Sequence, residues 1–218
     1  MNGTIRRSRL APSALFALAA TVLLVAPLSQ PAEARRPRID RQEFHDDMRR
    51  VWEDHITWTR LFIVSAAADL PDLDATTARL LANQSDIAQT IRPFYGRAAA
   101  NQLEALLTDH ILGAADVLVA AKTADTAGFD EALAAWHVNG NQIADFLSGA
   151  NPDNWPKHHM RAMMREHLDL TLNEAAHRLG GEFELDVADY DAIHDSILEM
   201  ADMLSDGIVA QFPGRFTR

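Results

Sequence analysis

A short pattern that ends in a histidine and an aliphatic residue occurs three times in this chain of 218 residues. The copies are Val-Trp-Glu-Asp-His-Ile at 51–56, Leu-Leu-Thr-Asp-His-Ile at 106–111 and Met-Met-Arg-Glu-His-Leu at 163–168. Their histidines, His55, His110 and His167, lie 55 and 57 residues apart. The spacing predicts a tripled structural unit in which each unit places one imidazole at an equivalent position.

The residues around each histidine repeat with the period of an α-helix. Steps of three and four residues return to one face of a helix, and here that face is otherwise apolar. The row through His55 shows this pattern most clearly, with Phe44, Met48, Val51, Thr59, Phe62 and Ala66. Each of the three histidines is therefore predicted to lie on the buried face of a helix.

Proline, glycine and aspartate signals divide the rest of the chain into six helical segments. They cover about 40–68, 74–93, 97–123, 127–148, 154–180 and 187–213. No segment alternates between apolar and polar residues as a half-buried strand does. Because the connections are short, consecutive helices are expected to be antiparallel. The sequence predicts an all-α fold with a single domain at 35–218, a six-helix bundle built from three antiparallel helical hairpins.

The first 34 residues have the features of an export signal. Arg6, Arg7 and Arg9 precede an uncharged apolar run at 10–28, and Ala32-Glu33-Ala34 fits the small-x-small cleavage rule. Cleavage is predicted near Ala34, which would make the mature protein secreted or periplasmic. No later apolar run is long enough for a stable membrane span, so none is expected in the mature chain.

Composition excludes several classes of site and partner. The chain has no cysteine, which removes disulfides, thiolate metal ligands and cysteine nucleophiles. The formal net charge is −11 at pH 7. Because nucleic-acid binding depends on clustered lysine and arginine, this charge argues against a nucleic-acid partner.

The three histidines are the candidate metal ligands. Burying an imidazole without a partner costs about 1–3 kcal/mol, so three such burials require compensation. A metal ion, a small ligand or a network of hydrogen bonds would each supply it. The cofactor is therefore unknown: the nearby methionines favour copper, whereas carboxylate ligands would favour zinc or iron.

Further polar residues are candidates for binding the ligand beside these histidines. Asn83 and Asn139 follow His55 and His110 by 28 and 29 residues, each in an otherwise apolar row. The third hairpin offers Asp195 or Asp202 instead. Glu174 lies two turns beyond His167 on the same helical stripe, and Arg60 is interpreted as a surface charge.

These observations favour an exported, non-enzymatic helical bundle that binds a transition metal or small ligand in a histidine-lined pocket. A second interpretation is a structural or partner-binding bundle in which a buried histidine–asparagine network fixes helix register without a ligand. A third is an enzyme that uses a buried histidine as general base. No serine elbow, phosphate-binding loop or paired-carboxylate motif accompanies the histidines.

Four short segments resemble those of small exported helical proteins of bacteria. They are His-Ile-Thr-Trp-Thr-Arg at 55–60, Arg-Leu-Leu-Ala-Asn at 79–83, Pro-Phe-Tyr-Gly at 93–96 and Gln-Phe-Pro at 211–213. The resemblance implies an all-helical exported protein, and it carries no activity or ligand with it.

Overall fold

The computed structural model describes residues 37–217, which are helical apart from short connections and one isolated β-bridge. The predicted export signal at 1–34 lies outside the described residues. The α-helices are α1 (Arg41–Ala67), α2 (Leu73–Lys122), α3 (Thr126–Ala150), α4 (Lys157–Gly180) and α5 (Phe183–Gln211), and a short 3-10 helix η1 (Pro213–Arg215) follows. The predicted all-α class is confirmed.

Side chains and backbone conformation fix several helix ends. The Asp40 carboxylate accepts a hydrogen bond from the Glu43 backbone N–H at 3.0 Å, and Asp125 accepts from Gly128 at 3.0 Å. These are N-caps, which pair backbone donors that the first helical turn leaves free. Helix α4 ends at Gly181, whose φ of 74° is the left-handed conformation that glycine adopts readily.

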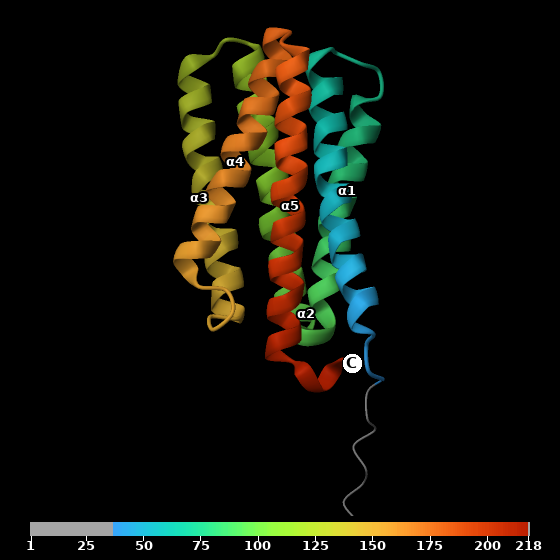
Figure 1. Ribbon diagram of the computed structural model, residues 1–218. Helices are drawn as coiled ribbons and strands as arrows, with labels where there is room; N and C mark the ends of the chain where they lie inside the picture. The colour runs from blue at the N-terminus through green and yellow to red at the C-terminus, as the bar shows by residue number, and fades with distance from the viewer. Residues whose placement is uncertain (1–36, 218) are drawn as a thin grey trace, which may run out of the picture. The chain divides into compact units, whose positions relative to one another are not determined.

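The predicted count of six helices in three matching hairpins is not supported, because α2 (Leu73–Lys122) joins two helical parts across a kink at Gly96. This helix contains Pro93 and a single non-helical residue, Gly96, with φ 84° and ψ 173°. The chain reverses its direction there, so that the two parts of α2 lie side by side (Figure 1). The part after Gly96 consequently runs in the same direction as α1 and α4 (Figure 1).

Replacing Gly96 with alanine should destabilise the fold by about 1–3 kcal/mol, because only glycine adopts this φ and ψ readily. A Cβ added at Gly96 would meet no atom within 4 Å, so the cost is conformational rather than steric. Gly149 in α3 is the matched control, since its Cβ would also meet nothing and its conformation is helical. Gly149→Ala should leave stability unchanged or raise it by up to about 1 kcal/mol. Urea unfolding of both variants tests this, and equal stability of Gly96→Ala and the wild type would refute it.

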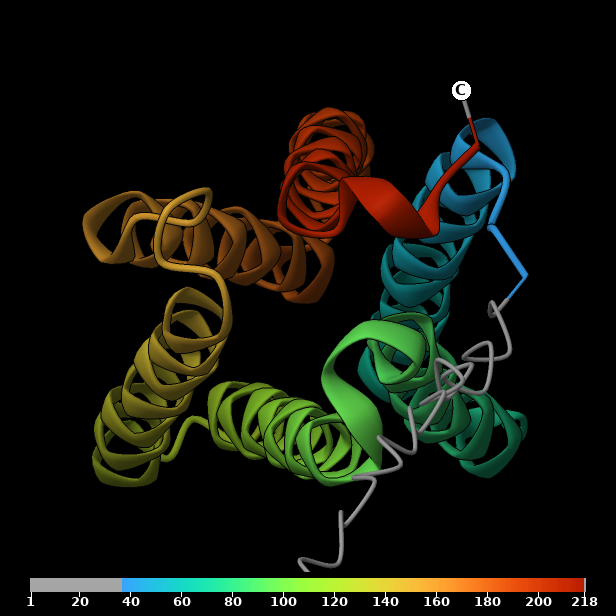
Figure 2. The same cartoon turned by 90° about the horizontal axis from the view of Figure 1, so that it is seen from below.

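The helices form a closed ring. Each helix packs against its neighbour in the chain, and α5 returns to pack against α1 (Figure 2). The two ends of the described chain also meet, since Ile39 and Phe216 form a parallel β-bridge. In this bridge the Ile39 N–H donates to the Arg215 carbonyl at 2.9 Å, and the Thr217 N–H donates to the Ile39 carbonyl at 2.9 Å.

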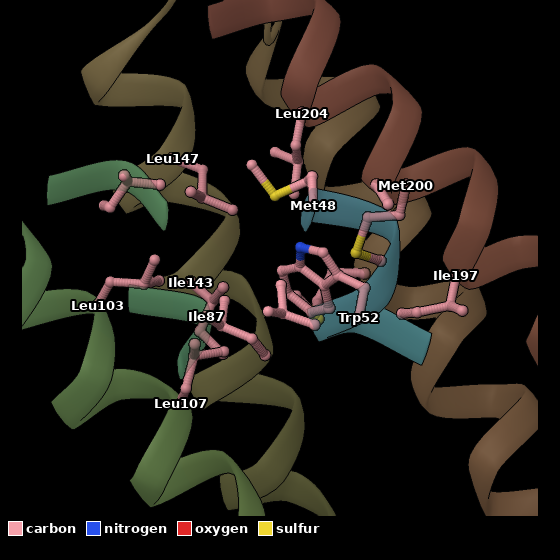
Figure 3. Packing of buried hydrophobic residues seen from close by; sticks show 14 of the residues in the cluster. Met48, Trp52, Ile87, Leu103, Leu107, Ile143, Leu147, Ile197, Met200 and Leu204 are labelled. Atoms are coloured by element: carbon pink, nitrogen blue, oxygen red, sulfur yellow. The ribbon is translucent and has the colours of Figure 1, made fainter. Parts of the chain in front are cut away.

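Apolar side chains from around the ring fill its centre. Trp52 of α1 lies in the middle of this cluster with side chains of α2, α3 and α5 around it (Figure 3). Labelled members are Met48, Ile87, Leu103, Leu107, Ile143, Leu147, Ile197, Met200 and Leu204. A second, smaller apolar cluster contains Phe62, Ile63, Leu80, Ile111 and Leu118. Between residues 37 and 217, no helix combines the length and the apolar character needed to cross a membrane.

Candidate site: three buried histidines

His55 of α1, His110 of α2 and His167 of α4 meet inside the ring; we call them the histidine cluster. Their exposed fractions are 2, 3 and 5%. The ring centroid of His167 lies 5.8 Å from that of His55 and 6.1 Å from that of His110. The three helical segments that carry them run in one direction (Figure 1).

Asn139 of α3 orients His110. Its side-chain amide donates to the Leu106 carbonyl at 3.0 Å, and its Oδ1 lies 2.9 Å from His110 Nδ1. An amide oxygen can only accept, so Nδ1 of His110 carries the hydrogen. The Nε2 of the neutral ring therefore has a free lone pair, which is the form that binds a metal or accepts a hydrogen bond.

Asn83 of α2 lies beside His55 as Asn139 lies beside His110, but of the two hydrogen bonds that Asn139 makes it repeats only the one from the side-chain amide to a backbone carbonyl. Its amide donates to the Val51 carbonyl at 3.0 Å, which is four residues before His55, just as Leu106 is four before His110. Within the described residues, Asn83 Oδ1 and His55 Nδ1 have no hydrogen-bond partner. Nδ1 of His167 has none either. Asn83 still acts on His55, because hydrogen bonding by its side chain raises the pKa of that ring. Because buried polar atoms are normally paired, Nδ1 of His167 marks a place for a further group.

The three imidazoles are neutral at pH 7. Burial and the nearby His110 lower the pKa of His55 to about 3, against the effect of the Asn83 side chain. Burial lowers the pKa of His110 to about 4, against the effect of the Asn139 hydrogen bond. Burial and the other two histidines hold the pKa of His167 well below its usual value. The cluster therefore presents unprotonated nitrogens to any ligand.

Two tryptophans wall the histidine cluster. The Trp136 ring stacks on His110 with centroids 5.2 Å apart, and its Nε1–H donates to the His110 carbonyl at 3.0 Å. Trp52 meets His55 edge to face at 5.7 Å, and its Nε1 has no partner among the described residues. Met48 and Met160, which suggested copper, lie in the apolar core cluster.

The present ring orientations do not form a metal site. Across residues 37–217, no three histidine, aspartate or glutamate side chains are placed so that they could hold a metal ion. His110 and His167 are 30° from parallel and stack on each other. A metal bound through nitrogens at about 2.0–2.1 Å would require these rings to turn so that their lone pairs converge.

Glu174 is buried, with 1% exposed, but it belongs to an ionic cluster rather than to the histidine cluster. Arg60 of α1 donates to Glu174 Oε1 at 2.6 Å and to Asp186 Oδ1 of α5 at 2.7 Å. Arg178 adds a contact of 3.3 Å to Asp186. Burial raises the pKa of Glu174 to about 7, while the hydrogen bond and charge of Arg60 act to lower it.

The interpretation of Arg60 as a surface charge is therefore wrong, and Asp186 is a buried residue that the sequence analysis missed. The arginine side chain is 20% exposed and the Asp186 carboxylate only 1%. Asp186 stands near the start of α5 in a run of acidic residues, so its sequence context resembles that of an exposed helix end. Its contact with Arg60, 126 residues away, gives no local signal.

Asp202, a candidate for the pocket, forms ion pairs with Arg49 and His45. Its carboxylate accepts from Arg49 Nε at 2.6 Å and contacts His45 Nε2 at 2.9 Å. The Arg49 and Asp202 side chains are 43 and 33% exposed. The third histidine accordingly has no carboxylate or amide partner matching Asn83 and Asn139.

Comparison with protein families, with curated proteins and with solved structures finds no match to this chain. The functional argument therefore depends on the geometry of the histidine cluster itself.

Proposed function

We propose that the protein binds a small ligand at the histidine cluster without chemical turnover, and that a transition-metal ion is the first ligand to test. One observation carries the proposal: three neutral, buried imidazoles meet, and Nδ1 of His167 has no partner among the described residues. The proposed setting is the periplasm or the cell exterior, because residues 1–34 have the features of an export signal.

The donor set suits a divalent transition metal better than a hard cation. Neutral imidazole is the commonest metal ligand in proteins and suits zinc, copper, iron and nickel. Asn139 would act as the group that fixes the tautomer of His110, as partners of metal-bound histidines usually do. The ring rotation that binding requires involves only side chains, and the aromatic walls at Trp52 and Trp136 would exclude water from the bound ion.

A structural role for the cluster is the second candidate. The bonds from Asn139 to His110 and Leu106, and from Asn83 to Val51, link neighbouring helical segments through buried polar groups. Such groups fix helix register in some bundles. On this interpretation no added ligand would change stability, and histidine substitutions would act only by breaking the network.

Metal titration separates the two candidates. Full-length protein without an added histidine tag is treated with a chelator and then titrated with Zn²⁺, Ni²⁺, Cu²⁺ or Co²⁺. We expect one equivalent to bind and to stabilise the protein by about 2.7 kcal/mol at a free concentration 100 times the Kd. His110→Asn should abolish the bound equivalent and the stabilisation. Elemental analysis and thermal unfolding provide the measurements.

The exposed pair His158 and His159 provides the matched control, because surface histidines also bind metal adventitiously. The double variant His158→Gln, His159→Gln should retain the bound equivalent. If that variant loses the metal while His110→Asn keeps it, or if no metal stabilises the wild type, the metal proposal is wrong. A destabilised His110→Asn protein that responds to no ligand would instead support the structural role.

A further inference from the structure

A small cavity lies one helical turn beyond the histidine cluster. Its volume is about 30 Å³. Three of its lining residues, Thr59, Ala114 and Thr171, each follow one of the three histidines by four residues. Four residues of α-helix span about 6 Å, so the cavity is adjacent to all three imidazoles at once. Trp136 belongs to both places, since it lines the cavity and stacks on His110.

The cavity lining offers no free hydrogen-bond donor. The hydroxyls of Thr59 and Thr171 donate to the carbonyls of His55 and His167, both at 2.8 Å. The Trp136 N–H donates to the His110 carbonyl. The remaining lining residues have only hydrocarbon side chains. A buried water usually makes two to four hydrogen bonds, which this lining cannot supply well, and apolar cavities in proteins stay dry.

We propose that this cavity binds an uncharged apolar molecule of about two heavy atoms, with dioxygen as the probe of that class. The volume sets the size, because a single water molecule needs about 10–15 Å³ of such space, so the cavity has room for about two heavy atoms. The hydrocarbon lining requires the bound molecule to be apolar. The position of the cavity places the bound molecule beside the histidine cluster. Any effect of this molecule on a ligand bound by the imidazoles rests on the proposed function above.

Methyl NMR of the chelator-treated protein under dissolved dioxygen tests the cavity. Dioxygen is paramagnetic and speeds the relaxation of nearby methyl protons. Ile63, Ile111 and Leu118 line the cavity, whereas Ile143 and Ile197 are fully buried in the main core and do not. We expect a larger enhancement for the cavity methyls than for the two core isoleucines. Equal enhancement in both sets would overturn the proposal, as would magnetisation transfer from a bound water to the cavity methyls.

Variants that fill the cavity provide a second test of the proposal. Ala114→Val adds two methyl groups to the lining and should remove the extra relaxation at Ile63 and Leu118. Ala175→Val fills the same space from α4 and replaces the first variant if that protein does not fold. Ala134→Val, at an exposed position of α3, is the matched control and should retain the effect. Enhancement that persists in the filled variants would contradict the assignment. Because no metal is present, the result is independent of whether metal binds the imidazoles.

Discussion

Lowering the pH from 7 to 5 should destabilise the metal-free protein by about 2 kcal/mol or more. The pKa values of His55 and His110 fall from an ordinary 6.5 to about 3 and about 4, and that of His167 also falls well below 6.5. A depressed histidine pKa means that the unfolded chain binds more protons, so stability is present above pH 6.5 and is lost as the pH falls. His55 and His110 each contribute about 2 kcal/mol to this loss at pH 5, and His167 adds to it.

Glu174 opposes part of this effect. Its pKa is raised from 4.5 to about 7, so its contribution to stability is present below pH 4.5 and is lost as the pH rises towards 7. Protonation of Glu174 between pH 7 and 5 therefore raises the free energy of unfolding by about 2 kcal/mol. The three histidines outweigh this one carboxyl, and the net change on acidification is a loss of stability.

Urea unfolding at pH 7 and pH 5 measures the difference. His167→Gln should reduce the loss on acidification, because one group with a depressed pKa is removed. The matched control is His158→Gln, whose histidine is exposed and should leave the pH dependence unchanged. If His167→Gln retains the full pH dependence of the wild type, then His167 is not held neutral by burial.

Arg60→Met should destabilise the protein by about 3–5 kcal/mol at pH 7. Removing one partner of a buried ionic cluster leaves charges without compensation, which costs far more than losing an exposed pair. Here the Glu174 and Asp186 carboxylates would stay buried without the guanidinium that binds both. Arg60 also lies 5.0 Å from the centroid of the Tyr190 ring, and methionine preserves much of that packing. Chemical unfolding of the variant gives the cost directly.

The arginine at position 49 offers the matched control for this prediction. Arg49 pairs with Asp202 where both side chains are partly exposed, so Arg49→Met should cost less than about 1 kcal/mol. The combined variant Arg60→Met, Glu174→Gln, Asp186→Asn should recover part of the loss, because it removes the uncompensated charges. Equal costs for Arg60→Met and Arg49→Met would show that the buried cluster contributes no more than a surface pair.

The histidine cluster illustrates what helical periodicity alone can predict. The rows through His55, His110 and His167 place each ring on an apolar face, and all three are buried. Asn139 was likewise predictable, because antiparallel packing returns the chain to His110 after 29 residues. What the sequence does not contain is ring orientation, since the turn of an imidazole depends on neighbours from several helices.

Glu174 and Asp202 show why the remaining polar residues were harder to assign. Both occupy plausible positions on their helices, yet each binds an arginine more than 100 residues away. A helical stripe identifies the face on which a carboxylate lies, but it does not identify which cation on another helix reaches it. The number of helices differs from the prediction for another reason, because the helical parts on either side of Gly96 join into one α2.

The parallel bridge between Ile39 and Phe216 has a consequence for how the bundle opens. A linear row of helices exposes its first and last members, which can detach singly by fraying. Here α1 and α5 pack against each other, and the bridge joins the segment before α1 to the segment after η1. Neither α1 nor α5 can detach without losing its contacts with the other helix. The first step of unfolding between these two helices therefore involves both ends of the described chain.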